Sequence, residues 1–263
     1  MQRQITTTKL SLAFSALLLA VSLTPFCFAQ NQPAQPPAYW VSVTQVKPGM
    51  MDQYQEFIKN ETLPAYKKAG GKEWATYVVQ TFGEAGEIWS IRPVENLKQF
   101  DEPNFLVKAL GEKGVQAWNA KRAQMIVSSR IFLISPRTEL SILPKEETKI
   151  GVGARVSVAP GRAAEYEKWV KGNILPALSK TNAKGVYVNR VGLGGNPNEY
   201  LAYVLFDSFE EIGKFQTAYG KALAELKLQA EPPAGLVVDQ KWAVYRYIPE
   251  LSLEPAPQKA ENK

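Results

Sequence analysis

Polar side chains interrupt the apolar strands that the sequence predicts in the second half of the chain. Arg155 breaks one apolar run, and Tyr187 and Asn189 share a face of the next strand. Tyr203 and Tyr245 lie on two later strands. A guanidinium group beside hydroxyl and amide donors suits an anionic or carbonyl-bearing ligand. These five residues therefore form a candidate ligand-binding site.

The same residues also allow a purely structural interpretation. An unpaired buried charge is very costly, so Arg155 could instead pair with an internal acid or lie at a strand end. Tyrosine rings are often part of a core. The only acids in the predicted strands, Glu87 and Asp239, lie in different halves of the chain. They therefore give no support for a paired acid/base mechanism. The sequence therefore identifies no catalytic residue.

The chain contains no histidine. Histidine is the commonest general base near neutral pH and a common metal ligand. Its absence excludes Ser-His-Asp and Cys-His catalysis, ordinary zinc sites and haem with a proximal histidine. We therefore expect no metal ion and no cofactor.

The first 29 residues have the pattern of a signal peptide. Arg3 and Lys9 give a positive start, residues 10–23 are apolar, and Cys27-Phe28-Ala29 resembles a cleavage site. The apolar run is shorter than the roughly 20 residues that span a membrane. A lipoprotein signal at Cys27 is an alternative, although the three residues before it include none of the expected small ones. We expect export to the periplasm or the medium, with no membrane association after cleavage.

Cleavage after Ala29 would remove the only cysteine, so neither a disulfide nor a thiol would remain. Loss of Arg3 and Lys9 lowers the formal charge from +6 to +4, since this segment holds no acid. The basic residues form no block, which argues against nucleic acid as a partner. We expect a small-molecule ligand and a monomer or homodimer.

The elements that would position these residues occur twice. Residues 48–68 return as residues 160–180, 112 positions later, and the match continues without a gap to Glu87 and Glu199. Each copy predicts β-α-β-β-α-β, the ferredoxin-like arrangement. The predicted strands are residues 39–46, 74–81, 87–92 and 123–134, and then 150–158, 186–191, 200–206 and 236–247.

Two details of the helices can also be predicted. Pro64 and Pro176 should interrupt or end the first helix of each copy. Asn96 with Gln99, and Ser208 with Glu211, fit capping boxes at the second helix. The expected organisation is a signal peptide (1–29), a disordered leader (30–37), repeat 1 (38–144), a linker (145–149), repeat 2 (150–253) and a disordered tail (254–263).

This element order, together with the duplication, resembles the dimeric α/β-barrel (ferredoxin-like) superfamily, and within it the uncharacterised EthD-, NIPSNAP- and ABM-like members. The resemblance implies an α+β fold in which two sheets pack face to face as a single-chain, pseudo-twofold barrel. It also implies that a ligand would lie between a sheet and its helices or inside the barrel. Some members of this superfamily are cofactor-independent monooxygenases that oxidise polycyclic phenols.

Three functions remain open. The first is an exported barrel protein that binds a small, partly apolar or anionic ligand. The second is a cofactor-independent monooxygenase or isomerase acting on an aromatic or carbonyl compound. The third is a protein-interaction module with a filled barrel. An enclosed cavity would favour the first two, whereas a filled interior beside an exposed apolar patch would favour the third.

Overall fold

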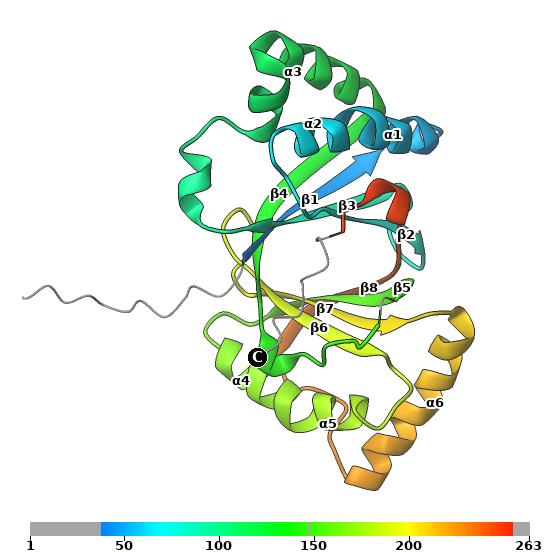
Figure 1. Cartoon of the computed structure of the whole chain (residues 1–263). Helices are drawn as coiled ribbons and strands as arrows, with labels where there is room; N and C mark the ends of the chain where they lie inside the picture. The colour runs from blue at the N-terminus through cyan, green and yellow to red at the C-terminus, as the bar shows by residue number, and fades with distance from the viewer. Residues whose placement is uncertain (1–37, 147, 255–263) are drawn as a thin grey trace, which may run out of the picture. The chain divides into compact units, whose positions relative to one another are not determined.

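The computed structural model describes residues 38–146 and 148–254 (Figure 1). The predicted signal peptide and leader, and nearly all of the predicted tail, lie outside the described residues. Eight antiparallel strands form a closed barrel in the order β1-β3-β2-β8-β5-β7-β6-β4. The strands are β1 (Ala38–Val46), β2 (Ala75–Thr81), β3 (Glu87–Val94), β4 (Ile126–Pro136), β5 (Ile150–Val158), β6 (Gly185–Val191), β7 (Glu199–Phe206) and β8 (Val237–Tyr247).

Each half of the barrel has the ferredoxin-like strand order, β4-β1-β3-β2 and then β8-β5-β7-β6. Two seams join the halves. Tyr77 pairs with Tyr247 across β2 and β8, and Ile134 pairs with Val191 across β4 and β6. The predicted α+β fold, two tandem ferredoxin-like repeats packed as a pseudo-twofold barrel, is confirmed. All eight strands come from one chain, so the barrel closes without a second copy.

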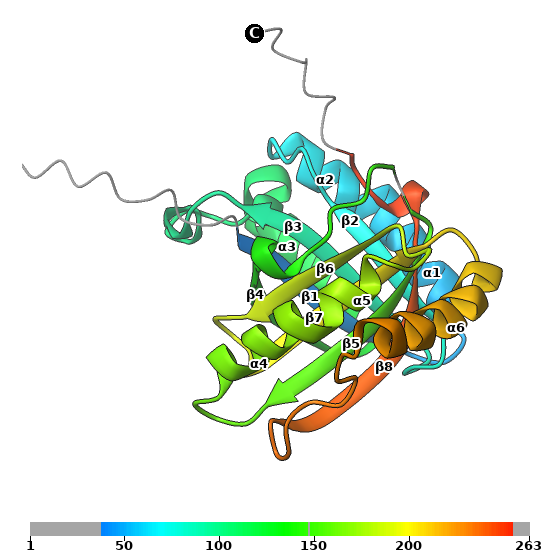
Figure 2. The same ribbon diagram turned by 90° about the horizontal axis from the view of Figure 1, so that it is seen from below.

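The helices lie on the outside of the barrel. In Figure 1, α1, α2 and α3 lie on the side of the first repeat, and α4, α5 and α6 on the side of the second. Figure 2 shows the second set lying across β5, β6 and β7. Each strand therefore has one face toward the helices and one toward the barrel interior. The helices are α1 (Met51–Phe57), α2 (Leu63–Lys68), α3 (Phe105–Met125, kinked at Gly111), α4 (Ala163–Trp169), α5 (Leu175–Leu178) and α6 (Phe209–Leu226).

The first helix of each repeat is interrupted just before its repeated proline and continues beyond it. A π-helical turn, Ile58–Thr62, joins α1 to α2, and its equivalent Val170–Ile174 joins α4 to α5. Proline has no N–H to donate, and its ring clashes with the carbonyl four residues earlier. The wider π turn separates these groups, and Pro64 and Pro176 then lie in the first turn of the following helix.

The predicted capping boxes have different outcomes. The Ser208 hydroxyl accepts a bond from the Glu211 amide (3.2 Å), and the Glu211 side chain accepts one from the amide of Asp207 (2.8 Å). Asn96 precedes only a short 3-10 helix, and its side chain makes no capping bond. The long helix α3 is capped by Asn104, whose Oδ1 accepts bonds from two amides. This helix also runs to Met125, so β4 begins later than predicted.

Aromatic rings fill the middle of the barrel. Trp89 lies edge-on to Phe132, Tyr203 and Tyr245, with ring centroids 5.5–6.4 Å apart. Gly153 on β5 makes room for two of these rings, because an added Cβ would lie 2.4 Å from Tyr245 and 2.9 Å from Tyr203. The barrel therefore has a packed aromatic centre.

Candidate functional site

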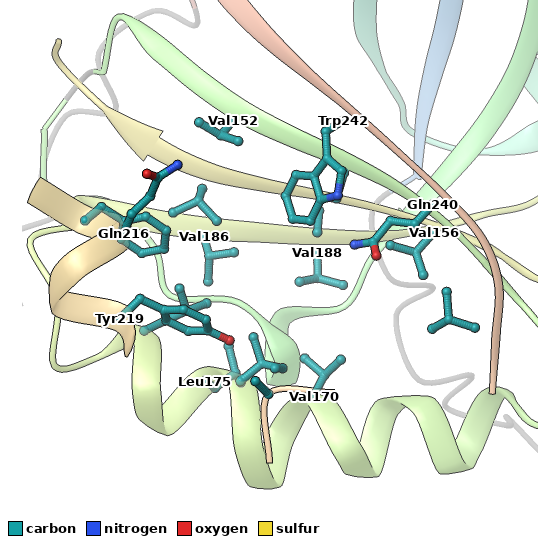
Figure 3. A pocket seen from close by; sticks show the side chains of 18 of the residues that line it. Val152, Val156, Val170, Leu175, Val186, Val188, Gln216, Tyr219, Gln240 and Trp242 are labelled. Atoms are coloured by element: carbon teal, nitrogen blue, oxygen red, sulfur yellow. The ribbon is translucent and has the colours of Figure 1, made fainter. Parts of the chain in front are cut away.

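A large pocket lies outside the barrel, between the sheet of the second repeat and helices α4, α5 and α6. Its volume is about 600 Å³, which is ample for a small organic ligand. Figure 3 shows strand side chains such as Val186 and Val188 meeting helix side chains such as Leu175 and Tyr219 across this space. We call it the helix–sheet pocket.

Three valines on neighbouring strands belong to the sheet side of the pocket: Val152 on β5, Val186 on β6 and Val204 on β7. Val204 pairs with both of the others across the ladders. The repeat makes their counterparts in the first half identifiable, 112 positions earlier: Trp40, Trp74 and Arg92. The pairing of Trp40 with Arg92 on β1 and β3 confirms this alignment in space.

In the first repeat, these larger side chains occupy the equivalent volume. The guanidinium carbon of Arg92 lies 4.6 Å from the ring centroid of Trp40 and 5.9 Å from that of Tyr66. Trp74 packs against Tyr66 with centroids 5.1 Å apart and against Trp40 at 6.2 Å. The pocket in the second repeat therefore exists because two tryptophans and an arginine are replaced by valines.

Two polar groups in the pocket have no partner. The Tyr54 hydroxyl of the first repeat donates to Thr44 Oγ1 at 3.5 Å. Its counterpart Tyr166 faces Val156 in place of a threonine, and its hydroxyl makes no hydrogen bond in the described part of the chain. The indole nitrogen of Trp169 is buried and makes no hydrogen bond to any described residue. Buried polar groups are nearly always hydrogen-bonded, so the Trp169 nitrogen is a candidate to bind a ligand. The Tyr166 hydroxyl is a second candidate, because Tyr166 lines the pocket and its hydroxyl is free to bond.

Exposed aromatic side chains also line the pocket. Trp242 on β8 is 54% exposed, and Phe82, from the β2–β3 turn of the first repeat, is 75% exposed. Phe82 also has a φ of +53°, in the left-handed region that side chains other than glycine, asparagine and aspartate rarely adopt. The first repeat thus contributes a strained aromatic residue to a pocket of the second.

A second, smaller cavity of about 350 Å³ lies inside the barrel. Four of the five residues predicted from the sequence line it: Tyr187, Asn189, Tyr203 and Tyr245. Burial raises the pKa of Tyr187, Tyr203 and Tyr245, so all three hydroxyls stay protonated near neutral pH. We call this space the interior cavity.

The fifth predicted residue, Arg155, is paired elsewhere. Its Nε donates to Glu199 Oε1 at 3.0 Å, and the side chains of Arg155 and Glu199 are only 22% and 12% exposed. Arg155 is not among the residues lining the interior cavity. The geometry therefore matches the ion-pair interpretation of Arg155, and the anion-binding interpretation has no free guanidinium in this cavity.

The chemistry of the helix–sheet pocket follows from its lining. The hydrogen-bonding side chains that the described residues contribute to it are those of Tyr166, Trp169, Gln216, Tyr219, Gln240 and Trp242, and none of these is charged. Among the described residues, no three His, Cys, Asp or Glu side chains are grouped so that they could hold a metal ion. No helix in the described ranges is long and apolar enough to cross a membrane. The pocket can surround an apolar molecule and offer it a few neutral hydrogen bonds.

No known protein-family profile matches the sequence, and no curated protein is similar to it. Solved structures share the fold. An anthrone oxidase-like protein superposes with a TM-score of 0.56 at 9% identity, covering 81% of this chain and 91% of that one. A candidate monooxygenase from Lactobacillus acidophilus has a TM-score of 0.52 at 11% identity, covering 81% and 94%. A candidate monooxygenase from Fusobacterium nucleatum superposes with a TM-score of 0.51 at 12% identity, covering 81% of this chain and 92% of that one. The chain thus has the fold of a dimeric α/β barrel, built as a single-chain tandem repeat.

The residues that open the helix–sheet pocket were not among the predicted site residues. Valines on the helix-facing side of a strand have the ordinary pattern of a core. A signal was nevertheless present, because the alignment of the two copies places Val152, Val186 and Val204 opposite much larger residues. Loss of volume between duplicated positions marks this pocket better than any polar residue does.

Proposed function

We propose that the protein binds a small, mainly apolar molecule with an aromatic ring system in the helix–sheet pocket of its second repeat. The observation that carries this proposal is the replacement of Trp40, Trp74 and Arg92 by valines at the equivalent positions. The replacement opens about 600 Å³ of apolar space. An unfilled cavity of this kind lowers stability, which a bound ligand would offset.

The lining favours an aromatic ligand with one polar edge. Trp169, Phe215, Tyr219 and Trp242 offer ring faces and edges to a flat molecule. The unpartnered hydroxyl of Tyr166 supplies a donor or acceptor for a carbonyl or phenol oxygen. A strongly charged ligand fits poorly, because no charged side chain lines the pocket.

Anthrone, a tricyclic ketone, is a suitable test molecule. Its binding to the mature protein can be followed by quenching of tryptophan fluorescence and by calorimetry. Val186→Trp should fill the pocket and weaken binding by at least about tenfold, because it removes the apolar contacts of one ring. Val127→Trp, which places the same side chain on an exposed position of β4, is the matched control. Equal affinity in both variants would contradict the proposal.

Cofactor-independent oxidation of such a ligand is the second candidate function. It is favoured by the anthrone oxidase-like and candidate monooxygenase proteins that share the fold. Anthrone would lose two hydrogens from its methylene carbon and gain one oxygen atom, giving anthraquinone. The second oxygen atom of O₂ would leave as water, so one O₂ is consumed for each anthrone. The apolar pocket would admit O₂, and the Tyr166 hydroxyl would bind the substrate oxygen.

The oxidation can be tested with an oxygen electrode and by the absorbance of anthraquinone. Under the proposal, the protein accelerates O₂ uptake over the spontaneous reaction, and Tyr166→Phe reduces the rate more than it reduces affinity. Binding of anthrone with no acceleration would leave the binding function standing and remove the oxygenase.

We also propose that the protein acts outside the cytoplasm. The support is the sequence pattern of residues 1–29, a positive start followed by an apolar run and a cleavage-like tripeptide. Sequencing the N-terminus of the protein secreted by its host should give Gln30 as the first residue. An intact Met1, or a lipid on Cys27, would overturn the predicted cleavage.

A further inference from the structure

The interior cavity is chemically different from the helix–sheet pocket. Six of its lining residues are aromatic, and the list is Tyr39, Tyr77, Trp89, Tyr187, Tyr203 and Tyr245. Glu73 is the one charged residue that the described part of the chain contributes to the lining. The remaining wall is largely apolar, with contributions from Ile91, Ile134 and Leu205. A carboxylate beside several aromatic rings is a distinctive combination, because each attracts positive charge.

Glu73 makes no hydrogen bond or ion pair among the described residues. It is half-buried in the segment just before β2. Burial, and then the charge of Glu73, raises the pKa of Tyr39, and the same charge contributes to the raised pKa of Tyr77. Both phenols therefore lie within electrostatic reach of the carboxylate. Burial raises the pKa of Glu73 itself, and no nearby cation opposes that effect.

We propose that the interior cavity binds an organic ammonium ion, with its charged group between Glu73 and the tyrosine rings. The faces of aromatic rings carry negative potential and attract ammonium groups. The apolar wall formed by Ile91, Ile134 and Leu205 would receive the hydrocarbon part of the ligand. An anionic ligand would meet the carboxylate of Glu73 and find no lysine or arginine in the lining, because Arg155 is held by Glu199.

Choline and its uncharged isostere 3,3-dimethyl-1-butanol separate charge recognition from shape. In calorimetry with the full mature chain, choline should bind at least about tenfold more tightly than the alcohol. Glu73→Gln keeps the shape of the side chain and removes its charge, so it should weaken choline binding and leave the alcohol unaffected. Choline binding no better than that of the alcohol, or unchanged in Glu73→Gln, would overturn the proposal.

Variants of Tyr187 distinguish the ring from its hydroxyl. Tyr187→Phe keeps an aromatic face, so it should retain choline binding, whereas Tyr187→Leu should weaken it. The opposite order would show that hydrogen bonding, and not the ring face, recognises the ligand, and it would overturn the proposed mode. Thermal unfolding of each variant checks that the barrel is intact. Val186→Trp in the other pocket should leave choline affinity unchanged, which keeps the two sites experimentally distinct.

Discussion

The indole N–H of Trp89 donates a 2.5 Å hydrogen bond to the carboxylate of Glu87 inside the barrel. Glu87 is 6% exposed and begins β3. Burial, helped by the charge of Glu84, raises the pKa of Glu87, and together they exceed the lowering by the Trp89 bond and by the charges of Arg155 and Arg130. The folded protein therefore holds a proton on Glu87 more tightly than the unfolded chain does.

This raised pKa predicts how stability depends on pH. A carboxyl group whose pKa is raised by folding is stabilising at low pH, and its contribution is lost as pH increases from its unfolded pKa of about 4.3 to the raised value. Glu87→Gln removes this dependence and can still accept the Trp89 bond. The variant should therefore melt at a higher temperature than the parent at pH 7, and the difference should shrink toward pH 4.

Calorimetric melting across this pH range checks the prediction. Glu112→Gln makes the same change of charge at an exposed position of α3, and it should alter the melting temperature little. If the difference in melting temperature between Glu87→Gln and the parent stayed constant down to pH 4, ionisation of Glu87 would not be its cause.

The strained backbone of Phe82 predicts that stability and affinity will change in opposite directions. Asparagine tolerates a positive φ better than phenylalanine does, so Phe82→Asn should raise the free energy of unfolding by up to about 1 kcal/mol. The same variant should bind anthrone less tightly, because the ring that lines the helix–sheet pocket is gone. Phe82→Leu retains the strain and part of the apolar contact, so it should show no gain in stability. Loss of stability in Phe82→Asn would show that the ring packs more firmly than its exposure indicates.

Exchanging the equivalent residues of the two repeats should have unequal effects. Trp74 is 4% exposed and packs against Tyr66 and Phe105. Trp74→Val should therefore lower the free energy of unfolding by about 3 kcal/mol, because it leaves a cavity. Val186→Trp enters existing space and should leave stability unchanged or raise it. Denaturant unfolding of both variants measures this difference, and a large loss in Val186→Trp would mean that the pocket is too small for the ring.

The ion pair of Arg155 with Glu199 should contribute to stability and not to ligand binding. Arg155→Met leaves Glu199 without its partner and should cost about 1–3 kcal/mol of unfolding free energy. Arg155→Met combined with Glu199→Gln should cost less than the two single changes added together, because neither charge is then left unpaired. Anthrone affinity should stay the same throughout. Weaker anthrone binding by Arg155→Met would contradict this prediction and show that Arg155 contributes to the ligand site.

The fold could be predicted from the sequence because the two copies share the residues that set turns, helix ends and strand periodicity. The Pro-Gly turns and the periodicity of the strands recur in register in both copies. The order of the strands in each half then follows from the ferredoxin-like pattern. The accommodation of Pro64 by a π turn could not be predicted. Its energy depends on packing of the whole helix against the sheet, and not on the proline alone.

The candidate site could be predicted only in part. Tyr187, Asn189, Tyr203 and Tyr245 do line one cavity, because alternate residues of neighbouring strands must point to the same side. The partner of Arg155 could not be identified from the sequence. Glu199 lies at the start of β7, and only the register between β5 and β7 places it beside Arg155. The alignment of the two copies shows that Val186 is smaller than Trp74, but only the structure shows that this difference leaves an open pocket between the sheet and the helices.

The closure of both barrel seams by a single chain has a consequence for how such a protein can change. In a barrel of two identical subunits, every substitution occurs twice, so a mutation that opens a pocket would weaken both halves at once. Here the valines occur in one half, while Trp40, Trp74 and Arg92 keep the other half packed. The tether also makes the association of the halves independent of protein concentration. Covalent fusion thus allows the two repeats to differ in role: the first keeps the barrel stable, and the second can accept substitutions that open a pocket.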